Sequence, residues 1–173
     1  MNTDHVLQTM NQCQVAYLLI GGMNYLLRHQ TLLTVDIDLW IADSEANRLR
    51  CEAALAALDA QWGRTDATWE PVRNKPPHWL DHQPVLSLNS PHGAIDIFKL
   101  VPGLADWQAS WQSSIAAETP GGVCYHGICD EDMLRSNGAA SWDSECDLSS
   151  QSFSQLIARE TAKRERNCAP KIR

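Results

Sequence analysis

The segment that most constrains the fold of this chain covers residues 17–40 and reads YLLIGGMNYLLRHQTLLTVDIDLW. It opens with four apolar residues that end at a glycine pair, and this pattern predicts a short buried strand over residues 17–20. The pair, Gly21 and Gly22, allows a sharp turn and a close approach of the backbone to a ligand. The residues from 23 to 28 or 29 then predict a short helix, whose free N–H groups would face the same turn.

A second strand, expected over residues 34–41, carries two acids one residue apart. Because side chains alternate along a strand, Asp36 and Asp38 should share one face. The apolar residues around them should pack on the other face: Val35, Ile37 and Leu39. Two neighbouring carboxylates repel each other, and this repulsion is costly unless a cation lies between them. The segment therefore predicts a phosphate-binding turn beside a divalent-metal site, which indicates chemistry on a nucleotide.

A third acid belongs to a predicted hairpin, with strands at 84–88 and 94–101 and a turn at 89–93. In the second strand Ile95 and Ile97 should face one way and Asp96 the other. If this strand lies beside the first two acids, the three carboxylates can hold two divalent ions for in-line attack at phosphorus. Asp96 would then serve as the base or as a ligand of the second metal ion.

The remaining segments predict helices around a sheet. Helices are expected at 4–14, 46–58, 104–112 and 129–135, with a second hairpin at 114–125 and a final helix at 152–166. The helix at 46–58 should pack on the sheet through residues at helical spacing: Leu49, Ala53, Ala56 and Ala57. Residues 64–83 contain three prolines and predict a long loop or lid, in which Trp69 and Trp79 pack the interior or, alternatively, stack on a nucleobase.

Composition and charge limit the classes of protein that need considering. The 173 residues favour one domain, taken as residues 1–137, followed by a polar, partly helical extension over 138–173. The formal net charge is −7, and residues 159–173 carry six Lys or Arg against two Glu, so the rest of the chain is strongly acidic. An acidic body disfavours broad nucleic-acid binding. Apolar runs well short of ~20 residues, no secretory signal pattern and six scattered cysteines predict a cytoplasmic protein without a membrane span or a disulfide framework.

Three motifs together resemble a known superfamily. LIGG at 19–22, DIDL at 36–39 after Thr34, and AID at 94–96 are similar to the motifs of the DNA polymerase beta-like nucleotidyltransferases. The likeness is greatest to the AbiEii-like and minimal nucleotidyltransferases of bacteria, and it covers about residues 15–137, including a DEDML-type helix. The resemblance implies an α+β nucleotidyltransferase fold, in which a mixed β-sheet packs against helices.

The resemblance also implies an activity and a set of site residues. A nucleoside monophosphate would pass from an NTP to a hydroxyl on a protein, tRNA or small-molecule acceptor, with two Mg²⁺ ions. The metal-binding and catalytic residues would be Asp36, Asp38 and Asp96. The nucleotide-binding residues would be Gly21, Gly22, Thr34 and Lys99.

Among the departures from the pattern of these relatives, two concern positive charge. Leu32 and Asn137 stand where relatives often carry basic residues. Cations elsewhere in the chain could replace them: Arg28, Lys99, Arg73 or Lys75. The departures leave an alternative open, a catalytically lapsed nucleotidyltransferase-fold module that binds a nucleotide or a partner protein, for example in a toxin–antitoxin setting.

Overall fold

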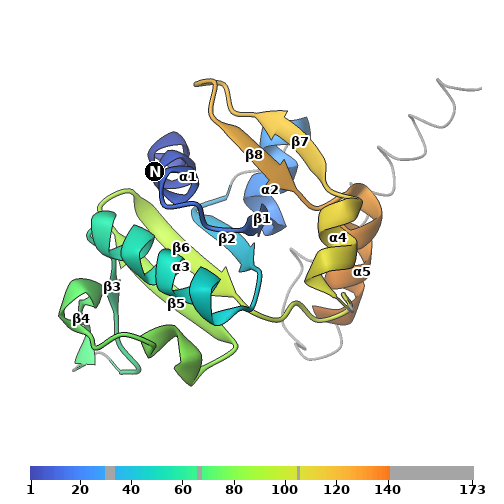
Figure 1. The fold of residues 1–173 in the computed structure, drawn as a ribbon. Coiled ribbons are helices and arrows are strands. Elements are labelled where there is room, and N and C mark those ends of the chain that lie inside the picture. Colours follow the sequence, from blue (N-terminus) through green and yellow to red (C-terminus); the bar gives the residue numbers. More distant parts are fainter. Residues whose placement is uncertain (30–33, 66–67, 105, 141–173) are drawn as a thin grey trace, which may run out of the picture.

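The computed structural model describes residues 1–29, 34–65, 68–104 and 106–140 of the chain. Among these residues, eight strands form one mixed sheet in the order β4-β3-β5-β6-β2-β1-β8-β7, with helices packed against it (Figure 1). The strands are β1 Tyr17–Leu19, β2 Asp36–Ile41, β3 Gln61–Trp62, β4 Glu70–Pro71, β5 Val85–Ser90, β6 Gly93–Phe98, β7 Ile115–Glu118 and β8 Cys124–Gly127. The α-helices are α1 Thr3–Gln12, α2 Gly21–His29, α3 Glu45–Ala57, α4 Trp107–Gln112 and α5 Asp130–Ala140.

The centre of the sheet is formed by three strands that the sequence predicts. Strand β2 runs antiparallel to β1 and parallel to β6, and β6 forms the predicted hairpin with β5. The register between β2 and β6 pairs Asp38 with Asp96. The predicted α+β class, with a mixed sheet packed against helices, is confirmed.

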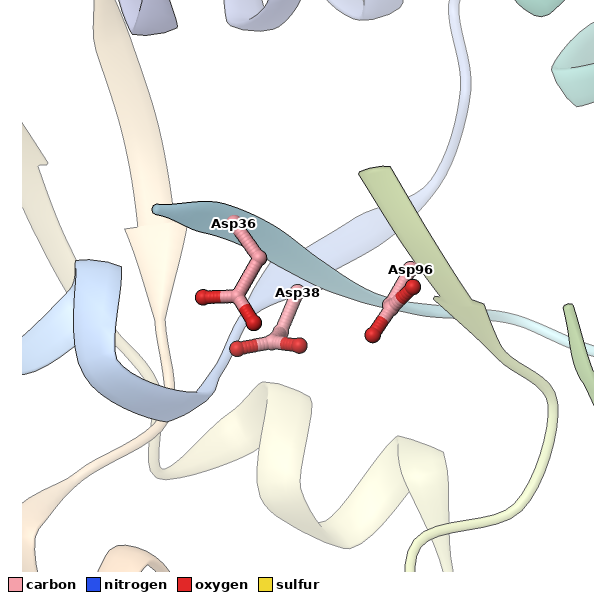
Figure 2. A group of neighbouring side chains, drawn as sticks. All are labelled: Asp36, Asp38 and Asp96. Carbon is pink, nitrogen blue, oxygen red and sulfur yellow. The ribbon is translucent and has the colours of Figure 1, made fainter. Parts of the chain in front are cut away.

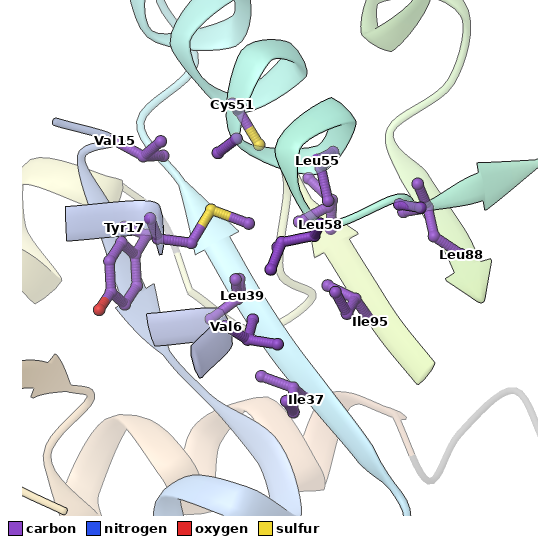
Figure 3. Packing of buried hydrophobic residues seen from close by; sticks show 14 of the residues in the cluster. Val6, Val15, Tyr17, Ile37, Leu39, Cys51, Leu55, Leu58, Leu88 and Ile95 are labelled. Carbon is purple, nitrogen blue, oxygen red and sulfur yellow. The ribbon is translucent and has the colours of Figure 1, made fainter. Parts of the chain in front are cut away.

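Hydrophobic residues form a separate core on each face of the sheet. Leu19 and Leu18 alternate along β1, and they belong to different buried clusters. The larger cluster joins Ile37, Leu39 and Ile95 to helices α1 and α3, and Figure 3 shows its packing. The smaller cluster contains Trp40 and lies on the opposite face, since its strand residues have the opposite parity.

The predicted packing face of α3 is wrong. Leu49 is 38% exposed, whereas Cys51 and Leu55 are fully buried. The buried stripe also includes two polar residues, Asn47 and Glu52, whose side chains satisfy backbone groups. The Asn47 amide exchanges two hydrogen bonds with the backbone of residue 16, and the Glu52 carboxylate accepts from two backbone N–H groups of the 78–80 segment. The residues chosen from the sequence therefore lie mostly on the exposed side of this helix.

The segment predicted as a long loop is well anchored. It contributes β4 and two short 3₁₀ helices, η2 Val72–Asn74 and η3 Trp79–His82. Arg48 forms an ion pair with Asp81 at 2.5 Å, which holds η3 to helix α3. Trp79 is 3% exposed and lies in the larger core, so the alternative in which Trp79 stacks on a nucleobase is wrong.

Several element boundaries differ from those expected. Strand β2 begins at Asp36, so Val35 is 81% exposed and does not pack on the sheet. Helix α2 includes the glycine pair as its first residues. Helix α5 extends beyond the expected residue 135 to Ala140. The expected helix at 152–166 and most of the expected extension from 138 lie outside the described residues, and the division into two parts stays a prediction.

No helix within the described residues has both the length and the apolar content required to cross a membrane.

Candidate active site

Three carboxylates meet on one face of the central sheet. Each of Asp36, Asp38 and Asp96 offers one carboxylate oxygen, and these oxygens all lie within 4.8 Å of one another. Figure 2 shows the three side chains on the same side of β2 and β6. The structure thus brings together the three acids that the sequence predicts as metal ligands.

The alternation of the two strands explains how the acids converge. Ile37 and Leu39 in β2, like Ile95 and Ile97 in β6, are fully buried on the opposite face. Burying these residues sets the register of the parallel pair, because a slip of one residue would turn every side chain to the other face. In the resulting register Asp38 lies directly beside Asp96.

The electrostatics of the cluster favour a bound cation. The pKa of Asp38 is raised to about 7, chiefly by burial and then by the neighbouring carboxylates of Asp36 and Asp96. The pKa of Asp96 is also raised, chiefly by burial and then by Asp36, while a hydrogen bond from the Ser87 side chain opposes the shift. Three converging carboxylates are hard oxygen donors of the kind that Mg²⁺ prefers. A divalent ion would remove the repulsion that raises these pKa values, so the residues fit the metal that the sequence implies.

The glycine turn lies directly against the acidic cluster. Gly21 has a φ of +61°, and a β-carbon at this position would overlap the Oδ2 atom of Asp38. Only glycine satisfies both the backbone angle and the close contact. The Ile20 N–H also donates to the Asp38 carbonyl oxygen at 3.0 Å. The first turn of α2, which contains Gly21 and Gly22, therefore begins beside the carboxylates, where its free N–H groups can meet an anion.

Thr34 lies with the cluster as well. Its hydroxyl donates to the Asp36 carboxylate at 2.6 Å. Leu32, which stands at a position that is basic in many relatives, lies outside the described residues.

Lys99 is not brought to the acids. Its ammonium group donates to the carbonyl oxygen of Leu80 at 2.8 Å. Lys99 has the same parity as Ile95 and Ile97, and Leu80 belongs to the same core cluster as these two residues. Its side chain therefore leaves the sheet on the face opposite to Asp96.

The other cations proposed from the sequence have partners of their own. Arg28 pairs with Asp130, Arg73 pairs with Asp59 at 2.7 Å, and Lys75 pairs with Glu70 at 2.8 Å. Asn137 lies in α5, and no hydrogen-bond partner for its amide nitrogen is found among the described residues.

Sequence reasoning missed Ser87. This residue is the cross-strand partner of Asp96 in the β5–β6 hairpin, and it lies on the same face as the acid. The signal was a hydroxyl between two buried leucines, Leu86 and Leu88, in the strand that pairs with the third acid. As the cross-strand neighbour of Asp96 on the same face, Ser87 is part of the candidate site, and its hydroxyl opposes the rise of the Asp96 pKa.

Comparison with known proteins supports the fold. The sequence matches no protein-family model and no curated protein. Among solved structures, the chain is similar to the solution structure of the antibiotic-resistance factor ANT(2'')-Ia, an aminoglycoside nucleotidyltransferase. The TM-score is 0.55 at 14% sequence identity, and the match covers 93% of this chain and 82% of that chain. The specific likeness to AbiEii-like proteins stays a prediction, and at this identity the comparison assigns the architecture alone: the chain has a nucleotidyltransferase fold.

Proposed function

We propose that the protein is a Mg²⁺-dependent nucleotidyltransferase that transfers a nucleoside monophosphate from an NTP to a hydroxyl of an acceptor. The observation that carries the proposal is the convergence of Asp36, Asp38 and Asp96, with oxygens within 4.8 Å of one another, beside the first turn of α2. The nucleotidyltransferase fold supports it.

Each part of the site has a role in this proposal. Asp36 and Asp38 hold the metal ion or ions, and the first turn of α2 meets the phosphates through its backbone N–H groups. Asp96 lies at the edge of the cluster toward β5 and orients or deprotonates the acceptor hydroxyl. When bound, divalent ions would neutralise the phosphate charge and lower the pKa of the attacking hydroxyl. Thr34 fixes the orientation of Asp36 through its hydrogen bond.

The acceptor can be a protein, an RNA or a small molecule. ANT(2'')-Ia is described as an antibiotic-resistance factor, which makes a small-molecule acceptor one of the classes to test. The acidic body of this chain disfavours a large polyanion as acceptor, because a nucleic acid requires a basic surface.

A second candidate is a lapsed transferase that binds a nucleotide or a partner protein. It is favoured by the positions of the cations, since Arg28, Arg73 and Lys75 pair with other carboxylates and Lys99 binds a carbonyl oxygen. A triphosphate would then be held mainly by metal ions and backbone N–H groups. The lack, among the described residues, of a cationic side chain at the triphosphate favours a module that binds a nucleotide without transferring it.

The two candidates are separated by one experiment. Binding of ATP, GTP, CTP and UTP is measured by calorimetry with and without Mg²⁺, for the wild type and for the Asp36→Ala and Asp38→Ala variants. Transfer is followed with α-³²P-labelled NTPs and a mixture of candidate acceptors. Metal-dependent binding and transfer that both variants lose support the enzyme, whereas binding without transfer to any acceptor class supports the lapsed module. Absence of nucleotide binding at every metal concentration would sink both the enzyme and a nucleotide-binding module.

A further inference from the structure

Helix α2 is fastened to the connection between β8 and α5 and to the first residue of α5. The Arg28 guanidinium donates through Nη1 to the Ile128 carbonyl oxygen at 3.0 Å, and through Nη2 it pairs with the Asp130 carboxylate. Asn24, one turn earlier in α2, donates to the same Ile128 carbonyl at 3.0 Å. His29 Nε2 lies 3.4 Å from the Asp130 carboxylate. Asn24 and Arg28 thus contact the connection at Ile128, and Arg28 and His29 contact the start of α5 at Asp130.

This contact is partly buried. The side chains of Arg28 and Asp130 are 8% and 21% exposed. Gly127, which precedes the connection, is packed so closely that a β-carbon there would overlap the amide oxygen of Asn24. A two-point contact of a partly buried arginine fork fixes both distance and orientation, unlike a flexible surface pair.

The other end of the same helix forms the glycine turn. Gly21 lies against the Asp38 carboxylate, and Arg28 follows it by seven residues, or about 10 Å along a helix. A helix of two to three turns moves as a unit, so a displacement at Arg28 changes the position of the first turn relative to the acids. The contact at Gly21 leaves little room for such a displacement.

We propose that Arg28 is a positioning residue that, through Asp130 and Ile128, sets the place of the α2 N-terminus beside the acidic cluster. The proposal rests on the proposed function, because it concerns how the nucleotide's phosphates are met. It differs from the expectation that Arg28 binds the triphosphate directly. The guanidinium is already occupied by two partners and lies at the end of α2 away from the glycines.

The Asp130→Asn variant distinguishes the two roles. If Arg28 contacts the triphosphate, Asp130→Asn releases its guanidinium, and nucleotide affinity stays the same or rises. If Arg28 positions α2, Asp130→Asn loosens the helix and weakens nucleotide binding as Arg28→Met does. We expect each variant to weaken the binding of ATP, GTP, CTP or UTP in the presence of Mg²⁺ by about tenfold. A small displacement of a binding group can reduce affinity by this much. The double variant should bind about as weakly as Arg28→Met, because the Arg28–Asp130 pair is already absent in that single variant.

A second measurement needs no nucleotide. In ¹⁵N-labelled full-length protein, the amide resonances of Gly21 and Gly22 should shift in both Arg28→Met and Asp130→Asn. Arg28→Lys keeps the charge but lacks the fork, so it should give smaller shifts. It tests the same position if one of the other variants fails to fold. The matched control is Arg135→Met, which removes pairs with Glu131 and Asp132 that lie within α5 and should leave both glycine resonances in place.

The proposal is overturned if the glycine resonances stay in place in folded Arg28→Met and Asp130→Asn. It is also overturned if only Arg28→Met loses nucleotide affinity. If the wild type binds no NTP, the proposed function fails, but the glycine resonances still decide whether Arg28 positions the turn.

Discussion

Gly21 and Asp38 lie in contact across the start of helix α2 and strand β2, with no space for a β-carbon between them. The contact joins the two halves of the candidate site, the helix N-terminus and the carboxylates. It also explains why a residue with a φ of +61° stands at this point, since glycine adopts this angle without strain. The glycine is therefore required by the geometry of the acid and not only by the turn.

Gly21→Ala should disturb both stability and metal binding. The added β-carbon would displace the Asp38 carboxylate and strain the backbone, at a cost of about 2–3 kcal/mol of unfolding free energy. Urea denaturation measures the stability, and Mn²⁺ titration followed by electron paramagnetic resonance measures the metal site. The control is Gly138→Ala in α5, where a β-carbon meets no atom of the described residues within 4 Å and stability should stay the same or rise by up to about 1 kcal/mol. Equal effects in the two variants would contradict the close contact.

Asp38→Asn should stabilise the metal-free protein while it abolishes metal binding. The substitution removes one of three repelling carboxylates and keeps the size of the side chain. We expect the metal-free variant to gain about 1–2 kcal/mol at pH 8, less than the full pKa shift of an isolated group would give. Thermal unfolding with EDTA and with Mg²⁺ checks both effects. A variant that is less stable than the wild type in EDTA would show that the repulsion is already relieved by another group.

The stability of the metal-free protein should depend on pH in a defined direction. The pKa of Asp38 is about 7 in the folded protein and near 3.8 when unfolded, so the folded state binds more protons between these values. The contribution of Asp38 is therefore fully present below about pH 4 and is lost as the pH rises through about 7. Urea midpoints in EDTA are compared from pH 5 to 8 for the wild type and Asp38→Asn. The difference between the two proteins should change in favour of the variant as the pH rises, and a change in the opposite sense would contradict the raised pKa.

Ser87→Ala should weaken metal binding with little effect on stability. Ser87 donates a hydrogen bond that opposes the rise of the Asp96 pKa, so its removal makes Asp96 harder to ionise. Mn²⁺ affinity should fall a few-fold, and the loss should shrink as the pH rises, because a raised pKa weakens binding only where Asp96 is protonated. Asn89→Ala, two residues along the same exposed side of β5, provides the matched control. If both variants bind Mn²⁺ equally well at pH 6, Ser87 has no role in the site.

Much of the central sheet could be predicted because its strands alternate with period two. In β2 and β6, the apolar residues that alternate with the acids indicate one buried face: Ile37, Leu39, Ile95 and Ile97. The alternation then places the acids on the other face. The packing of α3 could not be predicted in the same way. Asn47 and Glu52 are buried because distant backbone groups satisfy them, and those partners come from segments near residues 16 and 78.

By itself, the sequence determined the identity of the three acids, the glycine turn and the type of sheet that joins them, because these depend on local periodicity and spacing. Only the tertiary structure decided the roles of the long cationic side chains and of Ser87. Lys99 reaches Leu80 on the far face, Arg28 is held by Asp130, and Ser87 meets Asp96 across a strand pair. These partners lie in other elements of the fold, so their choice depends on how the elements pack and not on the order of residues along any one of them.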